Sequence, residues 1–325
     1  DWSSGEQEQL LLGIPYDHEV SIYVSCDFGH GPKHSSTIVT TTGPVPDGYE
    51  MPELIHGDPT RYEPTGQNLL GSINVDGGWQ EGNFWKFIHD REGRLVWAML
   101  TPHENWTLWT SIARSGDHLV WDELYEWPVE GQISQLHRMT LDGTILESVD
   151  AKGAHHAFTE KADGTLIWPS FGGLDGGEGE WIMAAAPGGE PEEVFHCEAY
   201  MDSIGFPSIC AHNSLFWHEP SDSVLYSLYS HSAVLEVDLA SGGVTRAFGG
   251  VPGAYTFDPE ESAFDWQHGV SYTDTGTLLV STHVALNDFE TVVREYEVGE
   301  QILHEVWNFG VDEGLTSFTT GDAHR

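Results

Sequence analysis

Histidines that recur at a fixed interval are the residues of this sequence with the clearest chemical potential. His156, His212 and His268 follow one another at steps of 56 residues, and a further step of 56 reaches His324. Imidazoles transfer protons, act as nucleophiles and bind transition metals near neutral pH. If the chain repeats a structural unit with this period, each repeat places one imidazole at the same height. We therefore expect these residues, far apart in sequence, to converge in space.

Residues beside these histidines are candidates for supporting roles, especially in binding a substrate. His155 precedes the first of them and is the alternative at that position, and Asn213 can orient His212 by a hydrogen bond or serve in a turn. Trp109 and Trp168 can line an aromatic pocket, although packing between sheets is the commoner role of tryptophan. A lone histidine near a strand is usually structural. Three or four in register favour a functional site.

The histidines belong to a repeated motif that consists of a histidine, a turn and an apolar strand. "HAFTEKADGTLIW" (156–168) and "HGVSYTDTGTLLV" (268–280) both place a glycine eight residues after the histidine, and "HNSLFWHEPSDSVLY" (212–226) has a longer turn. A second kind of segment alternates with this motif and is typical of a β-hairpin. It occurs at 84–99, 135–149, 233–248 and 292–307.

This alternation predicts the fold. Units of three to four short strands, at about 45–55 residues each, are typical of β-propeller blades. We predict an all-β β-propeller of about six blades, with a range of five to seven, formed by residues 66–325. The first strand of a blade lies innermost, so the motif histidines should surround the central axis.

The region 1–65 lacks the motif and is predicted to form a small N-terminal β element. Its segment "EVSIYVSCDFGHGPKHSSTIVTTTG" (19–43) is typical of a strand, a turn and a second strand. The element is either sandwich-like or completes a blade. The final "TTGDAHR" corresponds to the start of an inner strand, so either residues follow Arg325 or an N-terminal strand completes that blade.

The charge of the chain excludes several classes of partner. Twelve Lys and Arg face 52 Asp and Glu, for a net charge of -40. Such a chain repels phosphate backbones and anionic membranes, so we expect no nucleic-acid partner and no membrane-surface partner. The acidic runs "EQEQ", "DGGEGE" and "GGEPEE" are interpreted as solvated surface, suited to marine or halophilic surroundings. The alternative is weak Ca²⁺ binding by carboxylate clusters.

Cysteine usage and the chain start bear on the compartment. Cys197 and Cys210 flank a loop-like stretch and either form a disulfide or remain buried thiols; Cys26 is the third cysteine. No 18-residue apolar run exists, so we expect no membrane-spanning segment. The sequence starts at "DWSSGEQEQ" with neither an initiating Met nor a signal peptide, which is typical of a mature form. We expect an exported protein, secreted or periplasmic.

Four motifs, taken in order over residues 84–325, resemble the bacterial arylsulfotransferase family of β-propellers. "FIHDREGRLVWAM" is similar to the family's Asp-Gly-x-hydrophobic-Val-Trp hairpin, and "AHHAFTEKADGTLIW" to its His-His-Asp segment. The segment from "CAHNSLFW" to "RAFGG" resembles the His-x-Asn-Ser region with its Ser-Ser-Arg strand. "FDWQHGVSYTDTGTLLVS" resembles the Gln-His-Asp segment.

The resemblance implies a reaction, together with roles for named residues. The family transfers a sulfuryl group between phenolic compounds through a histidine, which would be His268, and it needs no cofactor. His156 (or His155) and His212 would neutralise the sulfate oxygens. This chain departs from the family where Tyr229 replaces the strand arginine, which removes a bidentate clamp for an anion.

Three functions therefore compete for the same residues. The first is sulfuryl transfer on a small, aromatic substrate, with His268, His212, His156 and Tyr229 as the catalytic group. The second is a metal-dependent enzyme in which His156, His212, His268 and His324 bind copper, zinc or iron, because neutral imidazoles without an arginine suit a transition metal. The third is a binding module without catalysis. The metal content of the purified protein distinguishes the second function from the others.

Overall fold

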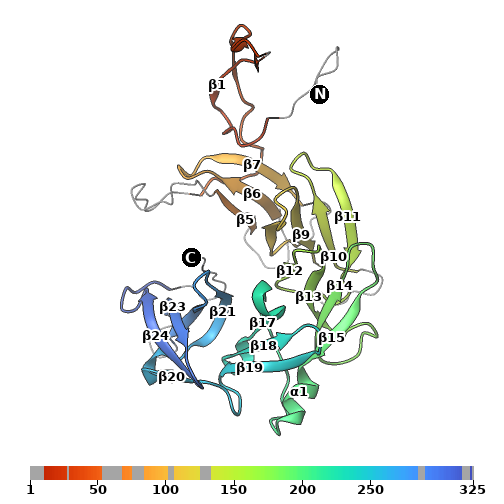
Figure 1. Ribbon diagram of the computed structural model, residues 1–325, viewed down its shortest axis with the longest axis vertical. Helices are drawn as coiled ribbons and strands as arrows, with labels where there is room; N and C mark the ends of the chain where they lie inside the picture. The colour runs from red at the N-terminus through yellow and green to blue at the C-terminus, as the bar shows by residue number, and fades with distance from the viewer. Residues whose placement is uncertain are drawn as a thin grey trace.

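The computed structural model is an all-β chain in which five sheets surround a common centre (Figure 1). The structure describes residues 11–27, 29–52, 68–74, 84–101, 106–124, 133–284, 290–316 and 323. Within this part of the chain the five sheets are the blades of a β-propeller. The number of blades lies inside the predicted range and one below its central value of six.

Blades 1 to 4 are antiparallel sheets of strands that follow one another along the chain, and blade 5 adds one parallel strand, β20 (Thr256–Asp258), to four such strands. Blade 1 contains β5 (Leu69–Asn74), β6 (Phe84–His89) and β7 (Leu95–Leu100). Blade 2 contains β8 (Thr110–Ile112), β9 (Leu119–Glu123), β10 (Gln135–Met139) and β11 (Ile145–Asp150). Blade 3 contains β12 (Thr159–Glu160), β13 (Leu166–Phe171), β14 (Glu180–Ala185) and β15 (Glu192–His196). Blade 4 contains β16 (Ser214–His218), β17 (Ser223–Leu228), β18 (Ala233–Asp238) and β19 (Gly243–Gly249). Blade 5 contains β20 (Thr256–Asp258), β21 (Asp265–Tyr272), β22 (Leu278–Val284), β23 (Glu290–Val298) and β24 (Ile302–Phe309).

The first strand of each blade from β5 to β16 lies at one edge of its sheet, and these edges face one another. Strand β5 contacts β8, β12 contacts β16, and β16 contacts β21. In blade 5 the inner strand is β21, because β20 pairs in parallel with the outer strand β24. Residues at the starts of inner strands from successive blades are thereby brought together.

The repeated segments of the sequence correspond to defined halves of the blades. The histidine motifs form the inner pairs β12–β13, β16–β17 and β21–β22. The predicted hairpins form the outer pairs β6–β7, β10–β11, β18–β19 and β23–β24. Gly164 and Gly276, the turn glycines of two histidine motifs, both have φ of +83°, a left-handed conformation that favours glycine.

Apolar side chains between neighbouring blades form the core. Because side chains alternate along a strand, each sheet presents apolar rows to the blades on both of its faces. One cluster joins blades 3 and 4 through Ile182 and Val224, and another joins blades 4 and 5 through Leu225 and Val280. These rows fix the sheets face to face and leave the strand ends free to carry polar groups.

The N-terminal element consists of two small antiparallel sheets beside blade 1 (Figure 1). Strand β1 (Glu19–Ile22) pairs with β4 (Ile38–Thr41), and β2 (Ser25–Asp27) pairs with β3 (Pro32–His34). Tyr49 packs against Trp85 of blade 1 and contacts His89 Nε2 through its hydroxyl at 2.7 Å. This buried contact ties the element to the propeller.

A disulfide joins Cys197 and Cys210, the alternative to two buried thiols. The stretch between them, expected to be loop-like, contains the short helix α1 (Cys197–Ser203). Cys26 is a free cysteine. The described residues include no helix of the length and apolar character needed to cross a membrane.

A buried lysine lies between blades 1 and 2. Lys86 is fully buried, its Nζ lies 3.7 Å from the centre of the Trp121 ring, and it donates a hydrogen bond to Thr101 Oγ1 at 2.9 Å. Burial lowers the pKa of Lys86 to about 7, although Asp122 and Glu123 oppose the shift. Protonation of Lys86 in the folded chain near neutral pH therefore lowers the free energy of unfolding.

Replacing Lys86 with Met should change how stability depends on pH. Between pH 7 and pH 10 the unfolded chain holds a proton on Lys86 that the folded chain has lost, so wild-type stability rises with pH in this window. The variant lacks this rise. Its stability relative to the wild type should fall with increasing pH, by up to about 1.4 kcal/mol per pH unit. Urea unfolding at several pH values measures this difference. A difference that is constant with pH would contradict the assignment. Lys152→Met, which removes an exposed lysine, is the matched control.

Candidate functional site

Three histidine rings from blades 3 and 4 meet at the starts of the inner strands. His155 and His156 precede β12, and His212 precedes β16. The ring centroid of His212 lies 4.5 Å from that of His155 and 6.0 Å from that of His156. The expected convergence of residues 56 apart is therefore present for His156 and His212.

A buried carboxylate lies between two of these rings. Glu180, the first residue of β14, is fully buried, and its Oε1 lies 2.7 Å from His212 Nδ1 and 2.9 Å from His155 Nε2. The first contact is a hydrogen bond, in which His212 Nδ1 donates when Glu180 is ionised. One ligand atom from each of the three residues lies within 4.8 Å of the other two, which is compact enough to hold a metal ion.

The same three residues carry buried polar atoms that have no hydrogen-bond partner. These atoms are His155 Nε2, His212 Nε2 and Glu180 Oε2. A buried polar atom without a partner costs free energy, and natural proteins rarely leave several together. The protein alone therefore leaves this donor set only partly satisfied, since His155 Nε2 lies 2.9 Å from Glu180 Oε1 and Tyr226 also acts on the carboxylate of Glu180.

Aromatic rings hold both imidazoles of the group in place. Phe171 stacks on His155 with ring centroids 3.9 Å apart and planes 8° apart. Tyr226 stacks on His212 with centroids 5.0 Å apart and planes 5° apart. A site whose rotamers are fixed by packing is preorganised for a ligand.

Burial keeps these imidazoles neutral. It lowers the pKa of His155 and of His212 to about 3, and the hydrogen bond from His212 to Glu180 opposes the shift only in part. Burial also raises the pKa of Glu180 above its ordinary value. Neutral imidazole is the form that binds metals.

His156 and His268 extend the group towards solvent. His156 has a left-handed backbone with φ of +60°, and its Nδ1 lies 2.7 Å from Nδ1 of His155. The residue is exposed. Desolvation by the surrounding protein lowers the pKa of His156 to about 3, with smaller contributions from His155 and His268. His268 in β21 is thus close enough to act on His156 electrostatically.

The backbone of blade 5 fixes the tautomer of His268. Its Nδ1 donates a hydrogen bond to the Trp266 carbonyl at 2.9 Å, and Nδ1 of His283 donates to the same oxygen at 3.0 Å. A carbonyl oxygen only accepts, so the neutral His268 ring carries its proton on Nδ1 and leaves Nε2 unprotonated. Trp266 has φ of +49°, a strained conformation of the kind found at functional sites.

The other predicted site residues lie in several environments. The Tyr229 ring is nearly parallel to that of His268, with centroids 6.4 Å apart. Asn213 is buried and donates to the Gln267 carbonyl at 2.6 Å, which joins blades 4 and 5. Trp168 is buried in the core between blades 2 and 3, and Trp109 packs against the same cluster. His324 lies outside the described residues.

Glu180 was not among the predicted site residues. It is the last residue of the acidic run "DGGEGE", which was interpreted as solvated surface. That interpretation is wrong for Glu180, while Asp175 and Glu178 of the same run are exposed. The available signal was the apolar strand sequence "WIMAAA" directly after it, which places Glu180 at a strand start. Of the two alternatives His155 and His156, His155 is the one that contacts Glu180.

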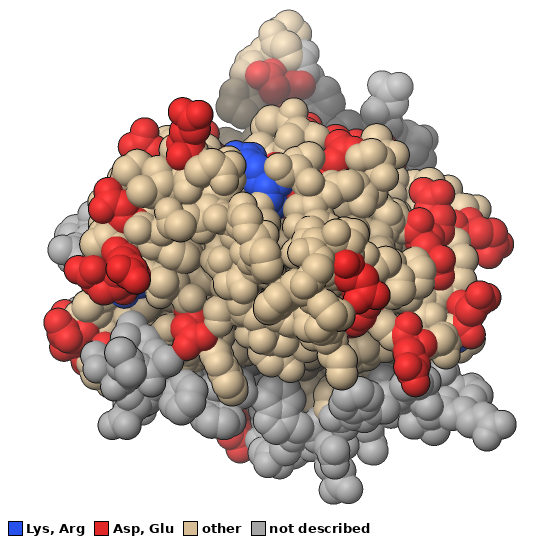
Figure 2. Space-filling model, turned by 90° about the horizontal axis from the view of Figure 1, so that it is seen from below, with Lys and Arg blue, Asp and Glu red and all other residues tan. Residues whose placement is uncertain are grey.

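Acidic side chains are otherwise spread over the surface. Figure 2 shows Asp and Glu distributed over the visible face, with Lys and Arg sparse. Glu190, Glu192 and Glu193 of the run "GGEPEE" are exposed, as predicted. Among the described residues, His155, Glu180 and His212 form the one group of His, Cys, Asp or Glu side chains close enough to hold a metal.

Fold and site together define an all-β propeller with a buried group of two histidines and one glutamate that can hold a metal. No known family model matches this chain, and no curated protein matches it.

Solved structures similar to the chain include the β-propeller domain of Cps50 (Swd1) from Myceliophteria thermophila, at 13% identity and a TM-score of 0.48, over 79% of this chain and 72% of that one. A protein of unknown function from Bacteroides caccae is similar at 13% identity and a TM-score of 0.46, over 75% and 73% of the two chains. A putative 6-phosphogluconolactonase from Bacteroides uniformis is similar at 10% identity and a TM-score of 0.43, over 74% and 67%. Likenesses at this level carry no information on function.

The tautomer of His268 can be observed directly. Long-range ¹H–¹⁵N correlation spectra at neutral pH should show its Nδ1 protonated and its Nε2 bare, because the Trp266 carbonyl accepts from Nδ1. His304, which contacts Asp258 on the outer strand of blade 5, serves as an internal comparison. A spectrum with the proton of His268 on Nε2 would show that the carbonyl contact is not formed in solution.

Proposed function

We propose that this protein is a metal-dependent enzyme whose axial site binds one transition-metal ion through His155, His212 and Glu180. The observation that carries the proposal is the group of unpartnered buried atoms on these residues, with donor atoms within 4.8 Å of one another. A bound cation would satisfy lone pairs that the protein leaves without a partner. It would also neutralise a carboxylate that is otherwise buried with two uncharged imidazoles.

The donor set favours a particular kind of metal. Two imidazoles and one carboxylate suit zinc, iron or copper, whereas calcium and magnesium prefer oxygen donors alone. Three protein ligands leave coordination positions open, which is typical of catalytic sites, whereas structural zinc sites have four protein ligands. We propose zinc as the first metal to test, with iron and copper next.

Protein groups beside the metal ligands can move protons. A metal bound in such a site supplies Lewis-acid catalysis and a water of lowered pKa. His268 presents an unprotonated Nε2, which suits a general base, and Tyr229 lies near it as a candidate proton donor. The reaction class that this set supports is metal-assisted hydrolysis or elimination on a small molecule. The disulfide fits an extracellular location, so we also propose that the protein is exported.

Sulfuryl transfer is the second candidate function, and the bare Nε2 of His268 is the observation that favours it. A neutral imidazole with its proton fixed on Nδ1 can attack an aryl sulfate through Nε2, as in the arylsulfotransferases that the sequence resembles. Tyr229 leaves the position of the family arginine without a cation. This candidate predicts transfer from 4-nitrophenyl sulfate to a phenol by metal-free protein, lost in His268→Ala and retained in His304→Ala.

Metal analysis by plasma mass spectrometry tests the first candidate. The wild type, reconstituted with zinc, should hold close to one metal ion per chain after gel filtration. His155→Ala, His212→Ala and Glu180→Gln should lose it, because each removes one ligand. Metal binding should also raise the free energy of unfolding by about 2.7 kcal/mol when free metal exceeds Kd 100-fold.

His304→Ala is the matched control, because this histidine is exposed and lies on the outer strand of blade 5. It should retain the metal. Wild-type protein that binds no zinc, iron or copper after reconstitution would overturn the metal proposal. Transferase activity in that same protein would establish the second candidate. Loss of both readouts would favour the binding-module interpretation.

A further inference from the structure

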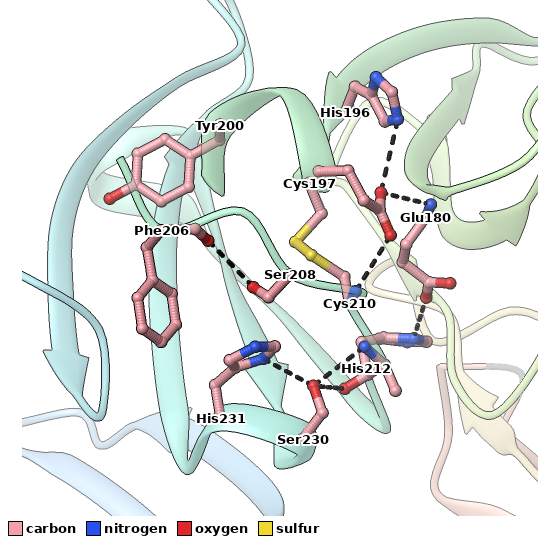
Figure 3. Close-up of a disulfide and its surroundings, with 12 residues drawn as sticks. Glu180, His196, Cys197, Tyr200, Phe206, Ser208, Cys210, His212, Ser230 and His231 are labelled. Atoms are coloured by element: carbon pink, nitrogen blue, oxygen red, sulfur yellow. Dashed lines mark hydrogen bonds and ion pairs between the residues drawn. A yellow bond between two sulfur atoms is a disulfide. The ribbon is translucent and has the colours of Figure 1, made fainter. Parts of the chain in front are cut away.

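The disulfide lies directly beside the candidate metal ligands (Figure 3). Cys197 begins helix α1 at the end of blade 3, and Cys210 stands two residues before His212. Both cysteines are buried, at 0% and 2% exposure. The covalent bond therefore ties the end of blade 3 to the segment that delivers His212.

Glu198, the residue after Cys197, makes a second connection between the same two parts. Its Oε2 accepts a hydrogen bond from the backbone N–H of Glu180 at 2.8 Å, and its Oε1 accepts one from the backbone N–H of Cys210 at 3.0 Å. One carboxylate thus holds the backbone of one proposed ligand and the approach to another. Bonds from backbone N–H groups to a carboxylate are charge-assisted and short.

The position of Glu198 depends on a helix that cannot persist alone. Helix α1 has seven residues, and isolated helices shorter than about 12–15 residues are marginal in water. His196 occupies the N-cap position before the helix, but its side chain makes no capping hydrogen bond. The disulfide at its first residue therefore anchors the turn that carries Glu198.

The segment after Cys210 is held within its own blade by weaker means. The Ala211 N–H donates to Ser230 Oγ at 3.1 Å, and Ser230 belongs to the short turn between β17 and β18. This contact places Ala211 relative to blade 4 but not relative to Glu180 in blade 3. Across the two blades, Glu198 and the disulfide act together with the His212–Glu180 hydrogen bond and the apolar cluster that joins blades 3 and 4.

We infer that Glu198 and the Cys197–Cys210 disulfide form a clip that sets the separation of Glu180 and His212, so that the metal site reaches its full affinity only after the disulfide has formed. Glu198 is then a positioning residue for the site and touches no metal. The inference rests on the proposed function. It implies an order of maturation in which oxidation of the two thiols precedes metal uptake.

The order can be reversed in the test tube by a dithiol. Dithiothreitol gives two electrons and two protons to the protein disulfide, which becomes two thiols, and is itself oxidised to its cyclic disulfide. Mild urea opens the buried bond, and anaerobic gel filtration then removes reagent and urea. A count of three free thiols per chain, against one in the oxidised protein, confirms complete reduction.

Zinc affinity, measured by competition with a chromophoric chelator, tests the clip. Compared with the oxidised wild type, the reduced protein and Cys197→Ala/Cys210→Ala should bind zinc about 10–100-fold more weakly, the usual effect of losing groups that support metal ligands. Glu198→Gln should weaken binding over the same range, because one N–H then faces an amide N–H₂. The double variant excludes zinc binding by the released thiols themselves.

Two controls match the variants in kind. Asp202→Asn removes an exposed carboxylate from the same helix, and Cys26→Ala removes the free thiol. Both should bind zinc as the wild type does. The visible spectrum of cobalt-substituted protein adds a readout that general destabilisation does not move, since its band positions report the ligand geometry. They should shift in Glu198→Gln and remain in Asp202→Asn.

The outcomes separate this inference from the proposed function. Oxidised wild type that binds no zinc would fail the proposed function itself. Zinc affinity that is equal in oxidised, reduced and Glu198→Gln protein would overturn the clip and leave the metal site standing. If the double cysteine variant does not fold, Glu198→Gln and the reduced chain still decide the question.

Discussion

The buried carboxylate of Glu180 is the constraint on which the arrangement of the site depends. Removing an ionised carboxylate from water is costly unless hydrogen bonds, a counter-charge or a metal compensate. Glu180 accepts one hydrogen bond from His212, lies beside His155, and keeps one oxygen without a partner. Its backbone N–H is fixed by a second carboxylate, that of Glu198. Several contacts thus hold Glu180 in place, although the protein does not neutralise its carboxylate by itself.

The propeller makes this arrangement possible because its stability resides elsewhere. Apolar rows between the blades hold the sheets together, and the starts of the inner strands are free to carry polar side chains. His155 follows blade 2, Glu180 begins the third strand of blade 3, and His212 precedes blade 4. Three residues over a span of 58 positions therefore meet at one point. The contact needs neighbouring blades to keep their separation, which explains why connections across the blades cluster here.

Much of the fold was predictable, because it is encoded in short-range patterns. Alternating apolar residues and glycine turns defined the hairpins, and their repetition defined the propeller. The convergence of His156 and His212 followed from the repeat alone. The number of blades was less certain, because the inner strands of the early blades lack the histidine. The sequence also left open whether Cys197 and Cys210 form a disulfide or remain thiols, since their spacing does not show whether the two side chains face each other.

The composition of the site was predictable only in part. Glu180 lies among glycines and acids, and only the start of β14 turns it inward, which the acidic run conceals. His155 rather than His156 contacts Glu180, because the left-handed backbone at His156 sets the directions of the two side chains. The spacing of the histidines does not show which of two neighbouring side chains makes the contact. Repeats predict where side chains gather, while the local backbone decides which of them touch.

The charge of the site bears on whether it binds a metal cation or an anionic substrate such as a sulfate ester. Imidazoles whose pKa is about 3 carry no charge at neutral pH, and Glu180 adds a negative charge when ionised. A site of this kind in a chain of net charge -40 repels a sulfate ester and attracts a cation. An anionic substrate would become acceptable only after a cation had entered the site. If both chemistries occur on this scaffold, the metal must bind first, and it would supply the positive charge that Tyr229 cannot.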